Sequence, residues 1–254
     1  MITEYFRPQK LDDALDLLAR KDPPTLALGG GLYINQFIKR PVAVVDLQDL
    51  GLTEIQDDGK VLQLGGALTL QRLLESGYPV AALEKAILHQ EGYNRRQVAT
   101  LAGTIVACDG RSPIAATLLA LDAELTLAVA GEKPVSERLG DFLPLREEVL
   151  AGRLITTIRI PKLINAAYHY VARSPADLPL VGAAAARWPS GRTRVVLLGY
   201  GREPLMVFDG PDAEGADLAA EDAYTEAGDQ WAGADYRSET AAVLVRRCLD
   251  EIAE

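Results

Sequence analysis

The segment Thr25–Asn35 constrains the fold of this chain more than any other stretch. A short apolar run over 25–28 ends in three consecutive glycines at 29–31, and a stretch compatible with a helix follows over 32–38. The pattern predicts a strand that enters a glycine-rich turn, where backbone N–H groups lie open and can hold a phosphate. The alternative is a tight strand-to-helix turn that needs glycine only for a positive φ. The glycines alone leave both hypotheses open, because short glycine motifs often occur by chance.

Composition limits the classes of function. The chain has 254 residues, of which 48% are hydrophobic and 24% are charged, which suits one large domain or two smaller ones. The formal net charge of -10 argues against a diffuse nucleic-acid-binding surface, since such a surface needs an excess of basic residues. Phosphate binding by backbone amides stays open because it does not depend on the global charge.

Cysteine and histidine are too few and too scattered for a self-contained metal or hydrolytic centre. Cys108 and Cys248 form no CxxC pair, so zinc and iron–sulfur sites lack ligands, and their spacing does not indicate a disulfide. His89 and His169 belong to no hydrolase arrangement, and we expect them to be packing or surface residues. We therefore predict no catalytic side chain and no metal site. If the chain takes part in catalysis, a cofactor supplies the chemistry.

The sequence also predicts where the protein resides. Its first residues contain no apolar segment of a secretory signal. No apolar run approaches the ~20 residues that are needed to span a bilayer. We expect a soluble, cytoplasmic protein without a membrane span.

The first part of the chain alternates strand and helix signals. The apolar positions 11, 14, 15 and 18 share one helical face, and the run 42–47 is apolar throughout, as in a strand buried on both faces. These signals predict strands at 4–8, 25–28 and 42–47 and helices around 11–20 and 32–38. This order is an α/β pattern.

The middle of the chain adds further elements. We expect strands at 61–66, 124–130 and 154–160 and helices at 70–76, 80–90 and 114–121, with Thr69 as the N-cap of the first of these helices and Pro113 in the first turn of the last. The run 98–107 is rich in small and β-branched residues. Small residues allow either a ligand or a second backbone to approach closely.

The pattern changes at about residue 166. Strands are predicted at 168–172, 183–188 and 194–199, with a hairpin turn at 189–191. Helices are predicted at 215–231 and 238–253. Strands followed by helices indicate a small α+β domain, with an antiparallel sheet and helices on one face.

Six short motifs, in a fixed order, connect these elements to a known family. They are LGGGLY at 28–33, VDL at 45–47, LGGALT at 64–69, LLALDA at 118–123, IRIP at 158–161, and YR at 236–237 followed by VLVRR at 243–247. Their order and spacing resemble the FAD-binding medium subunit of molybdenum hydroxylases, the group that contains carbon monoxide dehydrogenase and xanthine dehydrogenase. The resemblance covers nearly the whole chain.

The resemblance implies an α+β fold class. It implies a two-subdomain FAD-binding domain of the molybdopterin dehydrogenase (PCMH) type at 1–165, with subdomains at about 1–55 and 56–165, and a C-terminal α+β domain with an antiparallel sheet at 166–254. FAD would lie between the two subdomains. The implied cofactor-binding residues are Leu28, Gly29, Gly30, Gly31, Leu32, Tyr33, Thr100, Ala102, Gly103, Thr104 and Asp109.

The resemblance also implies a function. The chain would be an electron-transfer flavoprotein subunit and an oxidoreductase only as part of a complex. Electrons would come from a molybdenum-cofactor subunit through a 2Fe-2S subunit, and both would be separate chains because this one lacks ligands for those centres. The substrate is chosen in the molybdenum subunit, and the acceptor can be NAD or another molecule.

Three positions depart from the family pattern. The second flavin loop of the family usually reads RNxxTIGGN, whereas this chain has Ala102 in a glycine position and Thr104 in the asparagine position. Pro113 stands where the family usually has an aspartate that contacts the flavin. These departures predict weakened FAD binding. They also keep open the alternative of a structural subunit that has lost its flavin.

Overall fold

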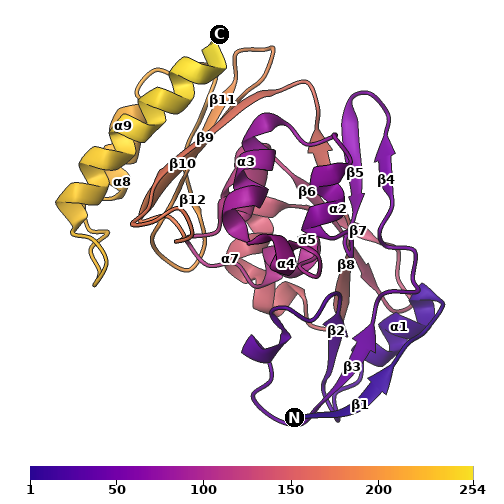
Figure 1. Cartoon of the computed structure of the whole chain (residues 1–254). Helices are drawn as coiled ribbons and strands as arrows, with labels where there is room; N and C mark the ends of the chain where they lie inside the picture. Colours follow the sequence, from indigo (N-terminus) through magenta and orange to yellow (C-terminus); the bar gives the residue numbers. More distant parts are fainter. Residues whose placement is uncertain (254) are drawn as a thin grey trace. The chain divides into compact units, whose positions relative to one another are not determined.

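The computed structural model describes residues 1–253 and divides into two compact units (Figure 1). The first unit contains Met1–Gly77, Tyr93–Ala107 and Glu124–Ile160, and the second contains Tyr78–Gly92, Cys108–Ala123 and the chain from Pro161 onward. Because the segments of the two units interleave, the contiguous domains 1–165 and 166–254 stay a prediction.

A three-stranded parallel sheet begins the first unit. Its strands are β1 (Ile2–Phe6), β3 (Val42–Asp46) and β2 (Thr25–Leu28), in that spatial order. All five residues of the central β3 are buried, as its apolar run predicts, and α1 (Leu11–Leu18) packs against this strand through one apolar face. Parallel pairing brings the carboxyl ends of β2 and β3 to one edge, where the glycine-rich loop begins.

The helix predicted at 32–38 is reduced to a single 3-10 turn, η1 (Ile34–Gln36). None of its residues is buried, and its N-cap residue Tyr33 makes no side-chain cap hydrogen bond. Without a buried face or a cap, a longer helix lacks its two usual sources of stability.

A five-stranded sheet completes the first unit. Its order is β4 (Ile55–Asp57), β5 (Val61–Gly65), β8 (Arg153–Pro161), β6 (Glu124–Val129) and β7 (Val135–Arg138). The helices are α2 (Leu70–Glu75), α4 (Tyr93–Arg96), α5 (Leu101–Val106) and α7 (Leu139–Val149). The predicted cap of α2 is confirmed, because the Thr69 hydroxyl accepts the N–H of Arg72 at 3.3 Å.

A four-stranded antiparallel sheet forms the centre of the second unit. Its order is β12 (Leu205–Gly210), β11 (Thr193–Leu198), β10 (Val181–Arg187) and β9 (Asn165–Val171). Alternate residues such as Ala183 and Leu197 pack against α8 (Ala216–Ala223) and α9 (Ala234–Ala253). Their neighbours, including Ala184 and Val196, are also fully buried.

The helices of 166–254 share one face of this sheet, as predicted, but helices from earlier in the chain cover the other face, which the sequence does not predict. Helices α3 (Ala81–Gln90) and α6 (Pro113–Ala120) come from the middle of the chain and pack against β9, β10 and β11. Every residue of α6 is buried, which explains why its sequence is apolar all round. As predicted, Pro113 occupies the first turn of α6, after the N-cap Ser112.

The two C-terminal helices differ in extent from their predicted ranges. The helix predicted at 215–231 ends at Ala223, and the one predicted at 238–253 already begins at Ala234. Between them the Asp229 carboxylate accepts the N–H groups of Trp231 at 2.7 Å and Ala232 at 3.1 Å. This capped turn replaces helical hydrogen bonds in the loop.

Candidate functional site

The glycine-rich loop starts at the carboxyl end of β2. Leu28 is the last residue of that strand and lies opposite Asp46 of β3. Gly31 has a positive φ of 77°, so the chain turns sharply there. Within residues 1–253, the N–H groups from Gly29 to Leu32 have no hydrogen-bond acceptor. Four consecutive open amides at the end of a parallel strand are donors of the kind that phosphate binding requires.

The segment 98–100 lies directly against this loop. A Cβ atom built on Gly30 would lie 1.7 Å from the carbonyl oxygen of Val98, and one on Gly29 would lie 2.8 Å from Oγ1 of Thr100. Any larger residue at either position would collide with this segment. Gly30 is therefore explained by close packing against the backbone of Val98, Gly29 by contact with the side chain of Thr100, and Gly31 by its positive φ.

The second predicted loop begins a helix whose amides are already bonded. Thr100 caps α5, accepting the N–H of Gly103 through Oγ1 at 3.2 Å and the N–H of Thr104 through its carbonyl at 2.9 Å. The N–H groups of Leu101 and Ala102 donate to the carbonyls of Leu68 and Gly66, at 2.9 and 3.1 Å. This helix start offers a phosphate no free amide.

The side chains of the second loop are also constrained. Thr104 is 2% exposed, and its hydroxyl donates to the carbonyl of Thr100 at 2.9 Å. Ala102 lies within α5, and Asp122 is the one residue other than glycine in 1–253 with a positive φ. The backbone strain that a positive φ would impose on Ala102 is therefore absent.

Asp109, a predicted cofactor-binding residue, and Pro113, which departs from the family pattern, both belong to the second compact unit. Asp109 is exposed, and its carboxylate accepts the N–H of Arg111 at 2.9 Å. Pro113 is buried at the start of α6. The structure thus brings together the loops at 28–33 and 98–104, which share one unit, and leaves Asp109 outside that group.

Asp46 is a neighbouring residue that the sequence does not single out as a site residue. It is 3% exposed, accepts the phenol of Tyr5, and accepts the N–H of Gln48 at 2.9 Å. The hydrogen bond to Asp46 raises the pKa of the Tyr5 phenol. An acidic residue at the end of a buried apolar strand is the signal that could have identified it, since buried carboxylates need partners.

Comparison with known proteins decides the family. Residues 1–163 match the family model described as the FAD binding domain in molybdopterin dehydrogenase. The chain belongs to this family. The resemblance of the sequence motifs to the molybdenum hydroxylase FAD subunits is thereby confirmed, and FAD is the cofactor of the domain.

Individual relatives agree with this assignment. The chain is 32% identical to the uncharacterized protein YgfM of Escherichia coli K12 over 215 residues, covering 82% of this chain and 79% of that protein. It is 27% identical to the carbon monoxide dehydrogenase medium chain of Afipia carboxidovorans, covering 97% and 95%. The carbon monoxide dehydrogenase structure from Hydrogenophaga pseudoflava matches with a TM-score of 0.83 at 20% identity, covering 100% of this chain and 98% of that one, and thus shares the α+β fold.

The site residues fit a nucleotide cofactor at one loop better than at the other. The open amides from Gly29 to Leu32 match the need of a diphosphate for backbone donors. The amides of 101–104 and the hydroxyl of Thr104 are already used inside the chain. The second loop therefore has no free donor for a phosphate. Its part in the site is to pack against the glycine-rich loop through residues 98–100.

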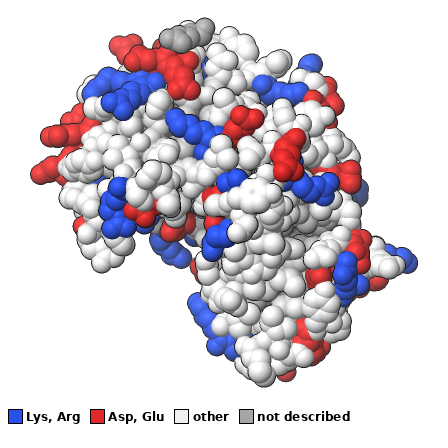
Figure 2. Space-filling model, in the orientation of Figure 1, with Lys and Arg blue, Asp and Glu red and all other residues white. Residues whose placement is uncertain are grey.

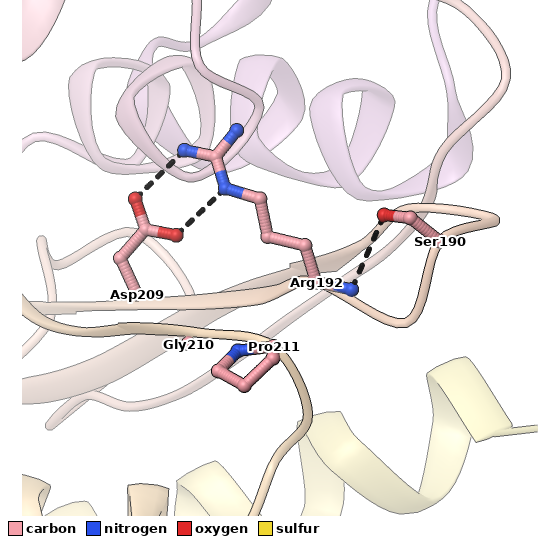
Figure 3. Close-up of a pocket in the computed structure, with 5 residues that line it drawn as sticks. All are labelled: Ser190, Arg192, Asp209, Gly210 and Pro211. Carbon is pink, nitrogen blue, oxygen red and sulfur yellow. Dashed lines mark hydrogen bonds and ion pairs between the residues drawn. The ribbon is translucent and has the colours of Figure 1, made fainter.

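A separate hollow of about 400 Å³ lies in the second unit (Figure 3). It is lined by Ser190, Arg192, Asp209, Gly210 and Pro211. Arg192 donates to both oxygens of Asp209 at 2.8 Å, and these bonds lower the pKa of that carboxyl to about 2. Because the charges of Arg192 and Asp209 neutralise each other, we do not assign a charged ligand to this hollow.

Both histidines have structural partners, as expected. His89 lies 2.8 Å from the phenol of Tyr168 and 2.8 Å from the carbonyl of Asp177, and His169 pairs with Glu251 at 2.7 Å. Cys108 and Cys248 are buried free thiols.

No helix within residues 1–253 is both long and apolar enough to cross a membrane. On the face in Figure 2, acidic and basic side chains are interspersed.

Proposed function

We propose that this chain is the FAD-binding electron-transfer subunit of a molybdenum hydroxylase-type oxidoreductase. The observation that carries the proposal is the open glycine-rich loop at the end of β2, inside a domain that matches the FAD-binding family over residues 1–163. The chain contributes binding and orientation. Bound FAD would supply the redox chemistry that its side chains lack.

The proposed contacts follow from the geometry of the first unit. The N–H groups from Gly29 to Leu32 would hold the diphosphate, with Leu28 and Tyr33 on either side. The segment from Thr100 to Thr104, including Ala102 and Gly103, would line the site with small side chains. Asp109 remains a proposed contact from the second unit. No side chain is assigned a proton-transfer role.

The proposed partners follow from the family. Named relatives are a carbon monoxide dehydrogenase medium chain and the alpha subunit of a 6-hydroxypseudooxynicotine dehydrogenase complex, 26% identical over 220 residues. For this chain we infer a molybdenum-cofactor subunit and a 2Fe-2S subunit as separate polypeptides in the cytoplasm. Electrons would pass from molybdenum through the cluster to FAD, and then to NAD or another acceptor.

A structural subunit without flavin is the competing hypothesis. It is favoured by the second loop, whose amides and Thr104 hydroxyl all have partners within the chain. In that case the glycines at 29–31 would only permit the glycine-rich loop to pack closely against residues 98–100, and they would bind no phosphate. The open amides of the first loop would then have no partner but water.

Purification of the tagged chain from its native host tests the proposal. The expected result is a complex that contains this chain with two further polypeptides, molybdenum, iron and the visible absorption of flavin. A complex with the metals but without flavin would support the structural subunit. Recovery of the chain alone, without flavin or metals, would contradict both hypotheses.

A further inference from the structure

The loop between α8 and α9 presents an exposed tryptophan. Trp231 is 41% exposed, and its backbone N–H is fixed by the carboxylate of Asp229 at 2.7 Å. Tryptophan is enriched among residues that dominate the binding energy of protein interfaces. An exposed indole on a fixed loop therefore marks this surface as a candidate contact.

A fully buried arginine holds that loop in place. Arg237 is 0% exposed, and its Nη2 donates to both carboxylate oxygens of Asp229 at 2.9 and 3.0 Å. Its Nη1 donates to the carbonyls of Ala227 at 2.6 Å and Ala232 at 3.3 Å. Burying a guanidinium group is costly unless such bonds are complete. The loop is thus organised before any partner arrives, which lowers the entropic cost of binding.

Two further arginines flank the indole. The guanidinium carbons of Arg173 and Arg111 lie 4.3 and 5.8 Å from the centre of the Trp231 ring. Arg173 pairs with Asp177 through Nε at 3.3 Å, and Arg111 donates through Nε and Nη2 to two backbone carbonyls. Within residues 1–253, the Nη groups of Arg173 and Nη1 of Arg111 have no acceptor. Cationic donors thus stand beside the indole, in a chain whose formal net charge is -10.

We propose that Trp231, Arg111 and Arg173, here called the Trp231 surface, anchor a partner subunit of the oxidoreductase complex. The partner's contact surface carries an apolar recess for the indole and carboxylates for the two guanidinium groups. Charge complementarity selects this occupant, because Arg111 and Arg173 keep guanidinium N–H groups beyond those bonded to Asp177, Leu178 and Pro179 within residues 1–253. The identity of the partner as a subunit of that complex rests on the proposed function.

The chain offers a matched control. Its other tryptophan, Trp188, also has two arginines at its ring, with the guanidinium carbons of Arg192 and Arg194 at 4.6 and 5.9 Å. Those arginines, however, are paired with Asp122 and Asp209 and offer fewer donors to a partner. Comparing Trp231→Ala with Trp188→Ala therefore separates an interface effect from the general loss of a cation–π contact.

The experiment is co-purification of the native complex through a tag on this chain, with the wild type, Trp231→Ala, Arg173→Glu and Trp188→Ala. Flavin content and thermal unfolding are measured in parallel. We expect Trp231→Ala and Arg173→Glu to lower the recovered partner chains by about tenfold or more, with flavin and unfolding temperature unchanged. Trp188→Ala is expected to retain the partners.

Each other outcome is decisive. Full recovery of the partners with Trp231→Ala overturns the inference and leaves the proposed function intact. Equal loss in both tryptophan variants, or loss together with a lower unfolding temperature, overturns it as an effect on folding. If Trp231→Ala abolishes self-association of this chain while the partners stay bound, the surface binds a second copy and the inference is wrong. Absence of partners from the wild type contradicts the proposed function and this inference together.

Discussion

The carbonyl oxygen of Val98 occupies the space that a side chain on Gly30 would need. A Cβ atom built there would lie 1.7 Å from that oxygen. This contact joins the glycine-rich loop to the segment before α5, and it changes how a substitution in the loop must be interpreted. Loss of flavin from a Gly30 variant shows a phosphate site only if the loop itself survives the substitution.

The first prediction concerns this contact. Gly30→Ala should destabilise the protein by about 1–3 kcal/mol, since backbone must move to admit the methyl group. Gly92→Ala is the matched control, because a Cβ there meets nothing within 4 Å and φ is not positive; its effect should stay within about 0.5 kcal/mol. Urea unfolding measures both. Equal stability of the two variants would show that the loops are not in contact in solution.

The second prediction concerns the cap of α5. Thr100→Val removes the oxygen that accepts the N–H of Gly103 at 3.2 Å but keeps the shape of the side chain. We expect a loss of about 1 kcal/mol, typical of an N-cap, and full stability for Thr100→Ser. If the valine and serine variants unfold at the same denaturant concentration, the hydroxyl does not stabilise this helix.

The third prediction concerns pH. Burial lowers the pKa of His89 from its usual 6.5, with a smaller lowering by Lys85, while the hydrogen bond to the carbonyl of Asp177 opposes the shift. The unfolded chain therefore takes up a proton more readily than the folded one. The contribution of the neutral histidine is complete above pH 6.5 and is lost as pH falls below that value. Unfolding free energies measured across this range should fall in the wild type and fall less in His89→Gln. Parallel profiles would exclude His89 as the cause.

The fourth prediction concerns a buried ion-pair cluster. Asp122, at a φ of 56°, accepts Nη1 of Arg194 at 2.9 Å, and Arg194 is only 5% exposed. Asp122→Asn tolerates the same backbone conformation and removes the charge, so we expect a loss of about 1–3 kcal/mol. Asp49→Asn, in an exposed pair with Arg7, should have no measurable effect. Similar thermal unfolding of both variants would contradict a stabilising role for the cluster.

Local signals explain most of what the sequence predicts correctly. The strand at 25–28, the cap at Thr69 and the proline at the start of α6 depend on neighbouring residues, and each is confirmed. The missed elements have weak local signals. Strands β4 and β7 are short sheet edges, and α7 contains Pro144.

Several features of the candidate site depend on contacts between distant residues and could not be predicted from the local sequence. The glycine run is visible in the sequence, but its contact with Val98 and Thr100 depends on the folded arrangement of the first unit. The sequence does not predict helix α5, because Gly103 and its β-branched neighbours have low helix propensity. Hydrogen bonds from the first amides of this helix to Gly66 and Leu68 compensate for that low propensity. Such long-range partners leave no local signal in one sequence.

The most direct test of the account is an equilibrium titration of FAD into the flavin-free chain, followed by flavin fluorescence. Ala102 has no positive φ and therefore no backbone strain, so weakening comes from the polar groups that Thr104 and Pro113 do not offer to the flavin. Two missing hydrogen bonds amount to about 1–3 kcal/mol, or roughly 5- to 150-fold in affinity. We predict saturable binding of one FAD per chain, weaker than nanomolar, that tightens with Thr104→Asn and Pro113→Asp combined. No saturable binding by either protein would contradict the assignment of this chain as a flavin-binding subunit.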